Sequence, residues 1–469
     1  MKELRTDYPL ERLFVRVLSP FERFLQRTTA GGIVLMGTTL LTLFIANSPW
    51  GPAFHYFWEQ PFQIRIGSWQ LPLTLHHLVN DGLMALFFLL VGLELKREIL
   101  VGELASLKDA ALPVVAAIGG MLVPALIYQA FNPQGPAAPG WGIPMATDIA
   151  FAVGVLVLLT WRIPRNLILF LTALAIADDL GAVLVIAFFY TANLHLAALG
   201  IAAALLVALT LLNRGGIRHP LPYGLLGLCL WAALLHSGVH ATIAGVLLAF
   251  TIPARPTYTP QQFDQRLTEL AQALRAETLN PETPDNPLSN ERLATIAENV
   301  EIAANAVQAP QQRMEHALAP WVTFWVIPVF ALANAGIDFS QIQLAAALTQ
   351  PVTVGVILGL IVGKFLGIGV TSWIAVRLGL GRLPTGVQWR HIFGAAWLGG
   401  IGFTMSLFIS QLAFVTSPEL FEQARLGILS ASVVAAAVGL LWLYVSALPR
   451  GSEGGIPSSE ADRAKALSQ

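Results

Sequence analysis

Twelve long apolar stretches constrain the fold of this chain more than any other feature. Each holds about 20 residues, the length that an α-helix needs to cross a hydrocarbon core of about 30 Å. They fall at residues 30–47, 78–95, 110–131, 142–160, 166–191, 194–212, 221–235, 236–252, 318–336, 352–376, 391–414 and 425–447. This pattern predicts an all-α polytopic membrane protein with about 12 transmembrane helices.

The composition supports the same fold class. Of the 469 residues, 55% are hydrophobic and only 12% are charged, whereas a soluble domain carries about 25% charged residues. So little charge cannot cover the surface of a soluble enzyme of this size. The formal net charge is -1, and no block of Lys and Arg is present, so we expect no nucleic-acid partner.

The basic residues predict the orientation of the chain. With the N-terminus inside, 24 of the 27 Lys and Arg fall in cytoplasmic segments, while Arg65 and Arg425 lie outside and Lys364 lies within a span. Cytoplasmic loops carry an excess of Lys and Arg. We therefore expect a multi-pass protein of the bacterial inner membrane with both termini in the cytoplasm.

The segments outside the spans suggest a division of the chain. In the outer loop at 63–70, apolar and polar residues alternate on both sides of a Gly, which predicts a short β-hairpin. An amphipathic pattern in the N-terminal segment, before the first span, predicts a helix that lies on the inner leaflet. The long acidic linker predicts two helices, at 261–277 and 291–308. The expected parts are residues 1–27 (N-terminal segment), 28–449 (membrane domain, core at 110–191 and 352–447, linker at 253–317) and 450–469 (polar tail).

Four ionisable residues lie deep within the predicted spans: Asp148, Asp178, Asp179 and Lys364. Such residues are costly in hydrocarbon and mark candidate functional sites. Asp178, Asp179 and Lys364 each lie about twelve residues into a span, so they share a depth near the midplane. Adjacent helical residues point about 100° apart, so one Asp can pair with Lys364 while the other faces a cavity.

Two neighbouring carboxylates in such a site disfavour being charged together, which suits exchange of protons for a cation. The alternative is a buried ion pair that only fastens two helices. For Asp178 and Lys364 alone the two interpretations are evenly balanced, whereas two adjacent Asp residues favour function because fastening needs only one.

Two spans are interrupted, at 142–148 and 397–404, and each is the middle member of a triplet of spans. Such a pattern predicts inverted repeats whose interrupted helices cross at a transport site. Thr147 and Asp148 lie in the first interruption, where the carboxylate can offset half-helix dipoles. The alternative for Asp148 is a simple helix cap, which is compatible with a transport role.

Several motifs resemble those of the NhaA family of sodium/proton antiporters, in order, over residues 28 to 447. They are NDGLMALFF (80–88), GLELKRE (92–98), ATDIAFA (146–152), LAIADDLG (174–181), SGVHAT (237–242), FALANAG (330–336) and GGIGFTMS (399–406). The resemblance implies electrogenic exchange of Na⁺ or Li⁺ for a larger number of protons by alternating access, in pH and sodium homeostasis, with no cofactor.

The resemblance also implies roles for individual residues. Asp179 would bind the cation, Asp178 would be a second proton carrier paired with Lys364, and Thr147 and Asp148 would line the crossing. The outer hairpin would join two protomers in a homodimer. The residues implied in the pH response are Glu94, Arg97, Glu98, His240, Glu315 and His316.

This chain departs from the family pattern in two places. The family has a short connection before Glu315, whereas this chain has the long linker, and Ala319 stands where a further His is expected. Both departures concern the pH response and not transport. Without the resemblance, His240 is most simply a neutral helix histidine with one hydrogen bond.

Two other functions fit a pair of intramembrane Asp residues less well. An intramembrane aspartyl protease places its carboxylates on different helices, whereas Asp178 and Asp179 are consecutive and cannot flank a scissile bond. A passive cation channel needs rings of carboxylates or carbonyls, and Lys364 at the midplane would oppose cation flow. We therefore expect a transporter and not an enzyme.

Overall fold

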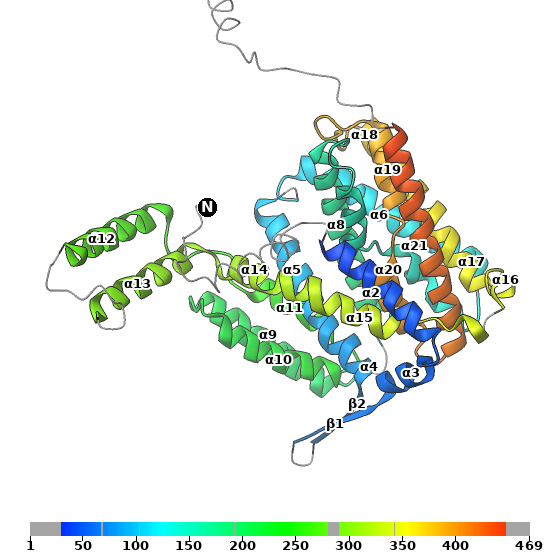
Figure 1. The fold of residues 1–469 in the computed structure, drawn as a ribbon, viewed down its shortest axis with the longest axis horizontal. Coiled ribbons are helices and arrows are strands. Elements are labelled where there is room, and N and C mark those ends of the chain that lie inside the picture. The colour runs from blue at the N-terminus through cyan, green and yellow to red at the C-terminus, as the bar shows by residue number, and fades with distance from the viewer. Residues whose placement is uncertain are drawn as a thin grey trace, which may run out of the picture.

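The structure is a computed structural model, and it describes residues 30–66, 69–102, 104–191, 194–279, 290–341 and 343–446. These residues form a bundle of helices with a β-hairpin at one end (Figure 1). The predicted N-terminal segment at 1–27 and the predicted tail at 450–469 lie outside the described residues.

Eight helical segments of the described chain are long and apolar enough to cross a membrane, or ten if each of two bent helix pairs is one span. The eight are Leu75–Val101, Lys108–Phe131, Ala138–Val157, Arg165–Phe189, Leu196–Arg214, Pro310–Asn334, Pro351–Arg377 and Pro418–Ser446. The bent pairs are α2 (Ala30–Ala46) with α3 (Gly51–Glu59), and α19 (Trp389–Leu398) with α20 (Phe403–Ala413). The chain is therefore a helical polytopic membrane protein.

The remaining two predicted spans correspond to shorter helices. Helix α10 (Pro220–Leu235) has 16 residues and α11 (Ile243–Thr251) has nine. The turn residues between them begin at His236, the C-cap of α10, and continue to Thr242. The turn suggested by residues 235–238 is confirmed, and the connection continues to Thr242, so the helix in the predicted span at 236–252 is shorter than expected.

The other elements complete the bundle. Several spans change from α- to π-helical geometry part-way along, which locally widens the turn. The elements are α4 (Leu75–His77), η1 (Leu78–Leu83), α5 (Met84–Val101), α6 (Leu107–Phe131), η2 (Ala138–Met145), α7 (Ile149–Val157), α8 (Arg165–Phe189), α9 (Leu196–Arg214), α14 (Pro310–Trp321), η3 (Val322–Val326), α15 (Ile327–Asn334), η4 (Phe339–Gln341), α16 (Leu344–Ala347), α17 (Pro351–Leu358), η5 (Gly359–Gly363), α18 (Lys364–Arg377) and α21 (Pro418–Ser446).

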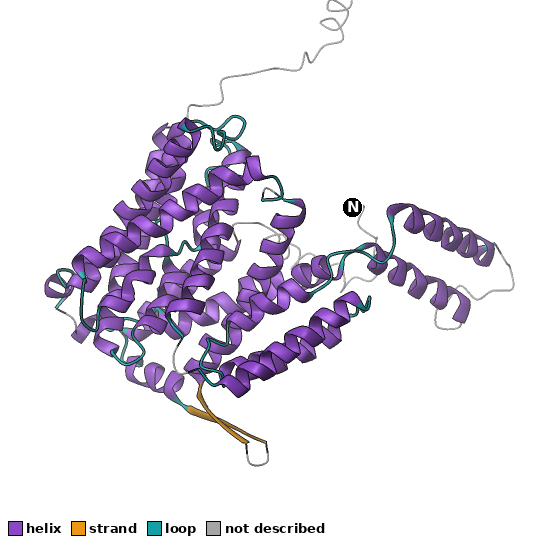
Figure 2. Ribbon diagram, turned by 180° about the vertical axis from the view of Figure 1, so that it is seen from behind, coloured by secondary structure: helices purple, strands orange, loops and turns teal. Residues whose placement is uncertain are grey.

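The predicted hairpin is confirmed. Strands β1 (Pro61–Ile66) and β2 (Trp69–Thr74) pair antiparallel, with Ile66 opposite Trp69 next to the turn. Figure 2 shows the hairpin projecting from one end of the bundle, away from the helices.

The two helices predicted in the long linker are confirmed as α12 (Pro260–Thr278) and α13 (Glu291–Val307). Thr259 caps α12 in a capping box with Gln262, and Pro260 occupies its first turn, as expected from the helix-start preferences of these residues. The backbone N–H groups of Thr257 and Tyr258 both donate to Ala306 O. The two helices project from the side of the bundle in both views (Figures 1 and 2).

Helices α6 and α18 approach so closely that their backbones touch. A Cβ atom added at Gly367 would lie 2.3 Å from the carbonyl oxygen of Gly119. Close approach through small residues is a common way for helices to pack in membranes. This contact holds the helix that begins with Lys364 against the first triplet of spans.

We predict that Gly367→Ala lowers the free energy of unfolding by about 1–3 kcal/mol, because the new methyl group overpacks the contact. The matched control is Gly200→Ala on α9, where a Cβ would meet no atom within 4 Å and where Ala stabilises a helix by roughly 0.5–1 kcal/mol. Thermal unfolding in detergent measures both. Equal stability of the two variants would contradict the prediction.

Candidate functional site

The two interrupted elements meet at the centre of the bundle. The break between η2 and α7 contains Thr147 and Asp148, and the break between α19 and α20 contains Gly399 and Ile401. Asp148 N donates to Ile401 O at 2.7 Å, and Thr147 Oγ1 donates to Gly399 O at 2.8 Å. Each break therefore supplies partners for backbone groups that the other break leaves outside a helix, as a lipid environment requires.

Asp148 joins the two half-helices that begin at the crossing. Its Oδ1 accepts from Phe151 N at 2.9 Å in the first turn of α7. Its Oδ2 accepts from Thr404 N at 3.0 Å and Thr404 Oγ1 at 2.6 Å in the first turn of α20. A carboxylate at a helix N-terminus satisfies free N–H groups and offsets the positive end of the dipole. One side chain thus caps two helices from different triplets.

Asp178 on α8 and Lys364 on α18 form a buried ion pair. Lys364 Nζ lies 2.6 Å from Asp178 Oδ2, and both side chains are fully buried. The same oxygen accepts from Thr147 N at 2.8 Å. The structure therefore brings together Thr147, Asp178 and Lys364, and the pair connects the two triplets of spans at the level of the crossing.

Asp179, the next residue on α8, is also fully buried, but its surroundings differ. Neither of its carboxylate oxygens has a hydrogen-bond partner among the described residues, and Asp178 Oδ1 has none either. Buried polar groups without partners are rare and costly. Three carboxylate oxygens of one dipeptide are therefore available to a proton or a cation.

A cavity of about 270 Å³ reaches Asp148 from one side. Glu94 on α5 and Thr404 share its wall, and two glycines of α2 and apolar side chains of α5, α7, η3, α15 and α20 supply much of the remainder. Glu94 therefore gives the cavity a second carboxyl group close to the crossing.

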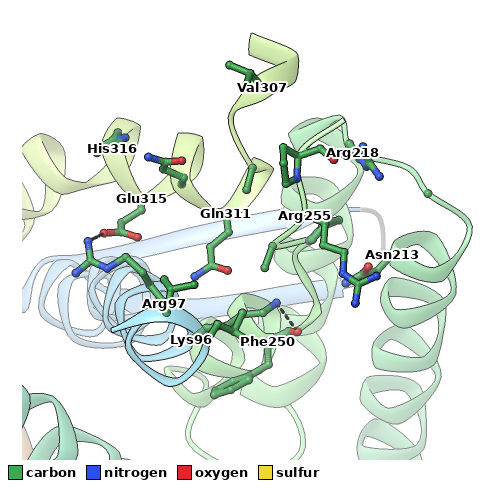
Figure 3. A pocket seen from close by; sticks show the side chains of 18 of the residues that line it. Lys96, Arg97, Asn213, Arg218, Phe250, Arg255, Val307, Gln311, Glu315 and His316 are labelled. Carbon is green, nitrogen blue, oxygen red and sulfur yellow. Dashed lines mark hydrogen bonds and ion pairs between the residues drawn. The ribbon is translucent and has the colours of Figure 1, made fainter. Parts of the chain in front are cut away.

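Three of the predicted pH-response residues, Arg97 near the C-terminal end of α5 and Glu315 and His316 in α14, line a larger cavity of about 1070 Å³. Arg97 lies 2.6 Å from Glu315 and 3.2 Å from Glu98, and His316 lines the cavity beside Glu315. Figure 3 shows the Arg97 and Glu315 side chains pointing toward each other from α5 and α14.

Two further contacts attach α14 and α11 to α5 beside this cavity. Gln311 Nε2 donates to Leu93 O at 2.8 Å. Lys96 Nζ donates to Phe250 O at 2.9 Å, near the end of α11 (Figure 3). The linker that carries α12 and α13 therefore returns to the bundle through a helix that is fastened to α5.

His240 is not part of this cluster. It lies in the connection between α10 and α11, and its Nε2 is 2.7 Å from Tyr190 O, just after the end of α8. The structure does not place it beside Arg97, Glu315 or the crossing.

Comparison with known proteins agrees with this arrangement. A family model described as Na⁺/H⁺ antiporter 1 matches residues 22–443. The Na(+)/H(+) antiporter NhaA of Syntrophobacter fumaroxidans is 68% identical over 443 residues, 94% of this chain and 94% of the relative. The protein of the same name from Acidithiobacillus ferrooxidans is 63% identical over 435 residues, 93% of this chain and 99% of the relative. The chain belongs to the Na⁺/H⁺ antiporter 1 family.

This family is one of transporters and not of enzymes. Two residues with hydroxyl groups at the crossing, Thr404 and Ser406, were not among the site residues predicted from the sequence. Thr404 contacts Asp148, and Ser406 Oγ donates to Ile143 O at 2.7 Å. Thr404 lies in the predicted interruption at 397–404 and Ser406 lies two residues after it, and that position was the available signal.

We predict that Lys364→Met destabilises this antiporter-family chain by about 3–5 kcal/mol, because it leaves the Asp178 charge buried without its cation. The double variant Asp178→Asn with Lys364→Met removes both charges and is expected to regain much of the loss. Thermal unfolding in detergent at neutral pH compares the three proteins. A double variant no more stable than Lys364→Met would contradict the prediction.

Proposed function

We propose that this chain exchanges Na⁺ or Li⁺ for H⁺ across the membrane. The observation that carries the proposal is Asp179, a fully buried carboxylate whose two oxygens have no partner among the described residues. A bare charge in such a place is unfavourable. A proton or a small cation neutralises it, and the two compete because they need the same oxygens.

The two adjacent carboxylates have different tasks in this proposal. Asp179 binds the transported cation and releases its one proton as it does so. Asp178 is the second proton carrier, and Lys364, at 2.6 Å, is the positive charge that compensates it when it is deprotonated. Two carboxyl groups can carry more protons than the single cation they exchange for, which makes the cycle electrogenic.

The crossing gives the site a framework that can face either side of the membrane. Asp148 and Thr147 fasten the two interrupted elements to each other, so the half-helices and the ions beside them can move as one unit. Relative movement of this unit and the remaining helices would expose Asp179 alternately to the two sides, as in transporters built on broken helices.

A passive cation channel is the alternative. It requires a continuous path of carboxylates or carbonyls, whereas the lining of the cavity that reaches Asp148 is largely apolar and Lys364 lies buried at the level of the site. These features support coupled exchange.

We infer the orientation and the regulation from the sequence. The excess of basic residues in alternate segments supports cytoplasmic termini and a bacterial inner-membrane location, with the domain division at 1–27, 28–449 and 450–469. We propose that Arg97, Glu315 and His316, which line the 1070 Å³ cavity, respond to cytoplasmic pH together with three residues outside its lining. The residues proposed for this response are Glu94, Arg97, Glu98, His240, Glu315 and His316. Exchange of this kind would serve pH and sodium homeostasis.

We also propose that two copies of the chain form a homodimer through the hairpin. Strands β1 and β2 form a two-stranded sheet, and each outer edge of such a sheet has backbone groups free to pair with another strand.

We predict that Asp179→Asn abolishes exchange, because an amide cannot alternate between binding a proton and binding a cation. The measurement is Na⁺-dependent dequenching of a pH dye in everted vesicles, and the signal is expected to fall to that of empty vesicles. Asp264→Asn on α12 is the control and should exchange at the parent rate. Robust exchange by Asp179→Asn would exclude Asp179 as the cation site.

We predict that replacing residues 61–74 by a short flexible connection converts a dimer into a monomer without loss of Na⁺-dependent exchange. Light scattering of the purified protein gives the mass. Removing α12 and α13 (260–307) in the same way is the control and should leave the dimer intact. A dimer that persists without the hairpin would refute this assembly.

A further inference from the structure

A cluster of polar side chains lies in the bundle close to the hairpin, away from the candidate site. His76 lies in α4, Asn80 in η1 and Asn334 at the end of α15. His76 Nε2 is 2.9 Å from Asn334 Oδ1, and Asn334 Nδ2 donates to Asn80 Oδ1 at 2.9 Å. Asn334 is fully buried. Burying amides is costly unless they are hydrogen-bonded, so this cluster requires a reason.

Two residues of the second triplet of spans complete the cluster. The amide of Gln411 on α20 lies 3.1 Å from His76 Nε2 and also contacts Asn334 Oδ1. Arg425 on α21, itself buried, donates to Asn334 O at 3.3 Å. We call His76, Asn334, Gln411 and Arg425 the polar lock.

The bonds of the polar lock connect two groups of helices. Gln411 and Arg425 belong to α20 and α21, which carry one arm of the crossing, whereas His76 and Asn334 belong to helices outside both triplets. A relative movement of the two groups must break the contacts of Gln411 and Arg425. The bond from Asn334 to Asn80 lies within one group and would survive.

The polar lock and the cavity lie on opposite sides of the crossing. The cavity that contains Glu94 reaches Asp148 from the side on which α5 ends. Toward the hairpin, the ring of Phe408 packs between those of Phe88 and Phe330. Its centroid lies 5.5 Å from that of Phe88 and 6.4 Å from that of Phe330. Gln411 lies one turn beyond Phe408 on α20. The path is therefore open toward one side and closed by an aromatic layer and the polar lock toward the other.

We propose that the polar lock is the latch of the gate on the hairpin side, and that its contacts break and re-form each time the site changes the side it faces. The proposal rests on the exchange function inferred above. Hydrogen bonds suit a latch because water can replace each lost partner when the gate opens, so opening leaves no amide unsatisfied. Gln411 and Asn334 are accordingly positioning residues for the transport cycle and touch no transported ion.

The test removes the contacts that cross between the groups and measures access to the gate. Gln411→Leu deletes both contacts of the Gln411 amide at similar volume. The reporter is Ala331→Cys, a fully buried position one turn before Asn334, in a background with Cys229→Ser because Cys229 is exposed. The rate of labelling by a membrane-impermeant thiol reagent is measured in right-side-out and in everted vesicles.

We expect Gln411→Leu to raise the labelling rate from the hairpin side by about tenfold, the factor that corresponds to a net hydrogen-bond contribution near the upper end of its usual range. His76→Phe removes one crossing contact and should raise the rate less. Gln129→Leu is the control, because the Gln129 amide makes a local bond, to Pro133 O at 3.2 Å, and its rate should equal that of the parent.

Equal labelling rates for Gln411→Leu, His76→Phe and Gln129→Leu, in proteins that remain monodisperse in detergent, would overturn the proposal. The rates are measured without ion exchange, so the two inferences separate. Faster labelling without any Na⁺/H⁺ exchange by the parent protein would support the latch and refute the proposed function. Normal exchange with unchanged labelling would do the reverse.

Discussion

The crossing of the two interrupted helices is the constraint on which the rest of the structure depends. A break in a membrane helix leaves backbone groups that lipid cannot satisfy. Here each break supplies hydrogen-bond partners to the other: Asp148 N donates to Ile401 O, and Thr147 Oγ1 donates to Gly399 O. Because the breaks must therefore lie side by side, α8 and α18 are brought to the same level, and the pairing of Asp178 with Lys364 follows from that placement.

Asp178 and Asp179 are neighbours in the sequence, but their carboxylates have very different surroundings. Asp178 has a cation and a backbone N–H as partners, while Asp179, one residue further along α8, has none among the described residues. The difference arises because adjacent helical positions point about 100° apart. A dipeptide of identical residues thus yields one stabilised charge and one vacant ligand, a division of labour produced by helix geometry alone.

The sequence predicted well how deep in the membrane the ionisable residues lie, but it predicted poorly which side chains contact one another across the bundle. The constant rise of a helix is enough to place Asp178 and Lys364 at one level. The contact of Thr404 with Asp148 depends on the register of one broken helix against another, which no local pattern encodes. The polar lock escaped prediction for a different reason: Asn334 and Gln411 lie near span ends, where polar residues are ordinary. The short α11 escaped it because the run at 236–252 has nearly the length of a span, although its first seven residues, 236–242, form a connection.

The linker helices α12 and α13 have a practical consequence. Most of the mass of this protein is embedded in lipid or detergent, which gives electron images few features for alignment. The pair projects from the bundle (Figure 1), and two hydrogen bonds from Thr257 N and Tyr258 N to Ala306 O join the chain before α12 to the end of α13 at its base. An antibody fragment raised against these two helices would serve as an orientation marker on a surface remote from the crossing. The bound fragment would not restrain the helices that move during transport, so their movement could be imaged.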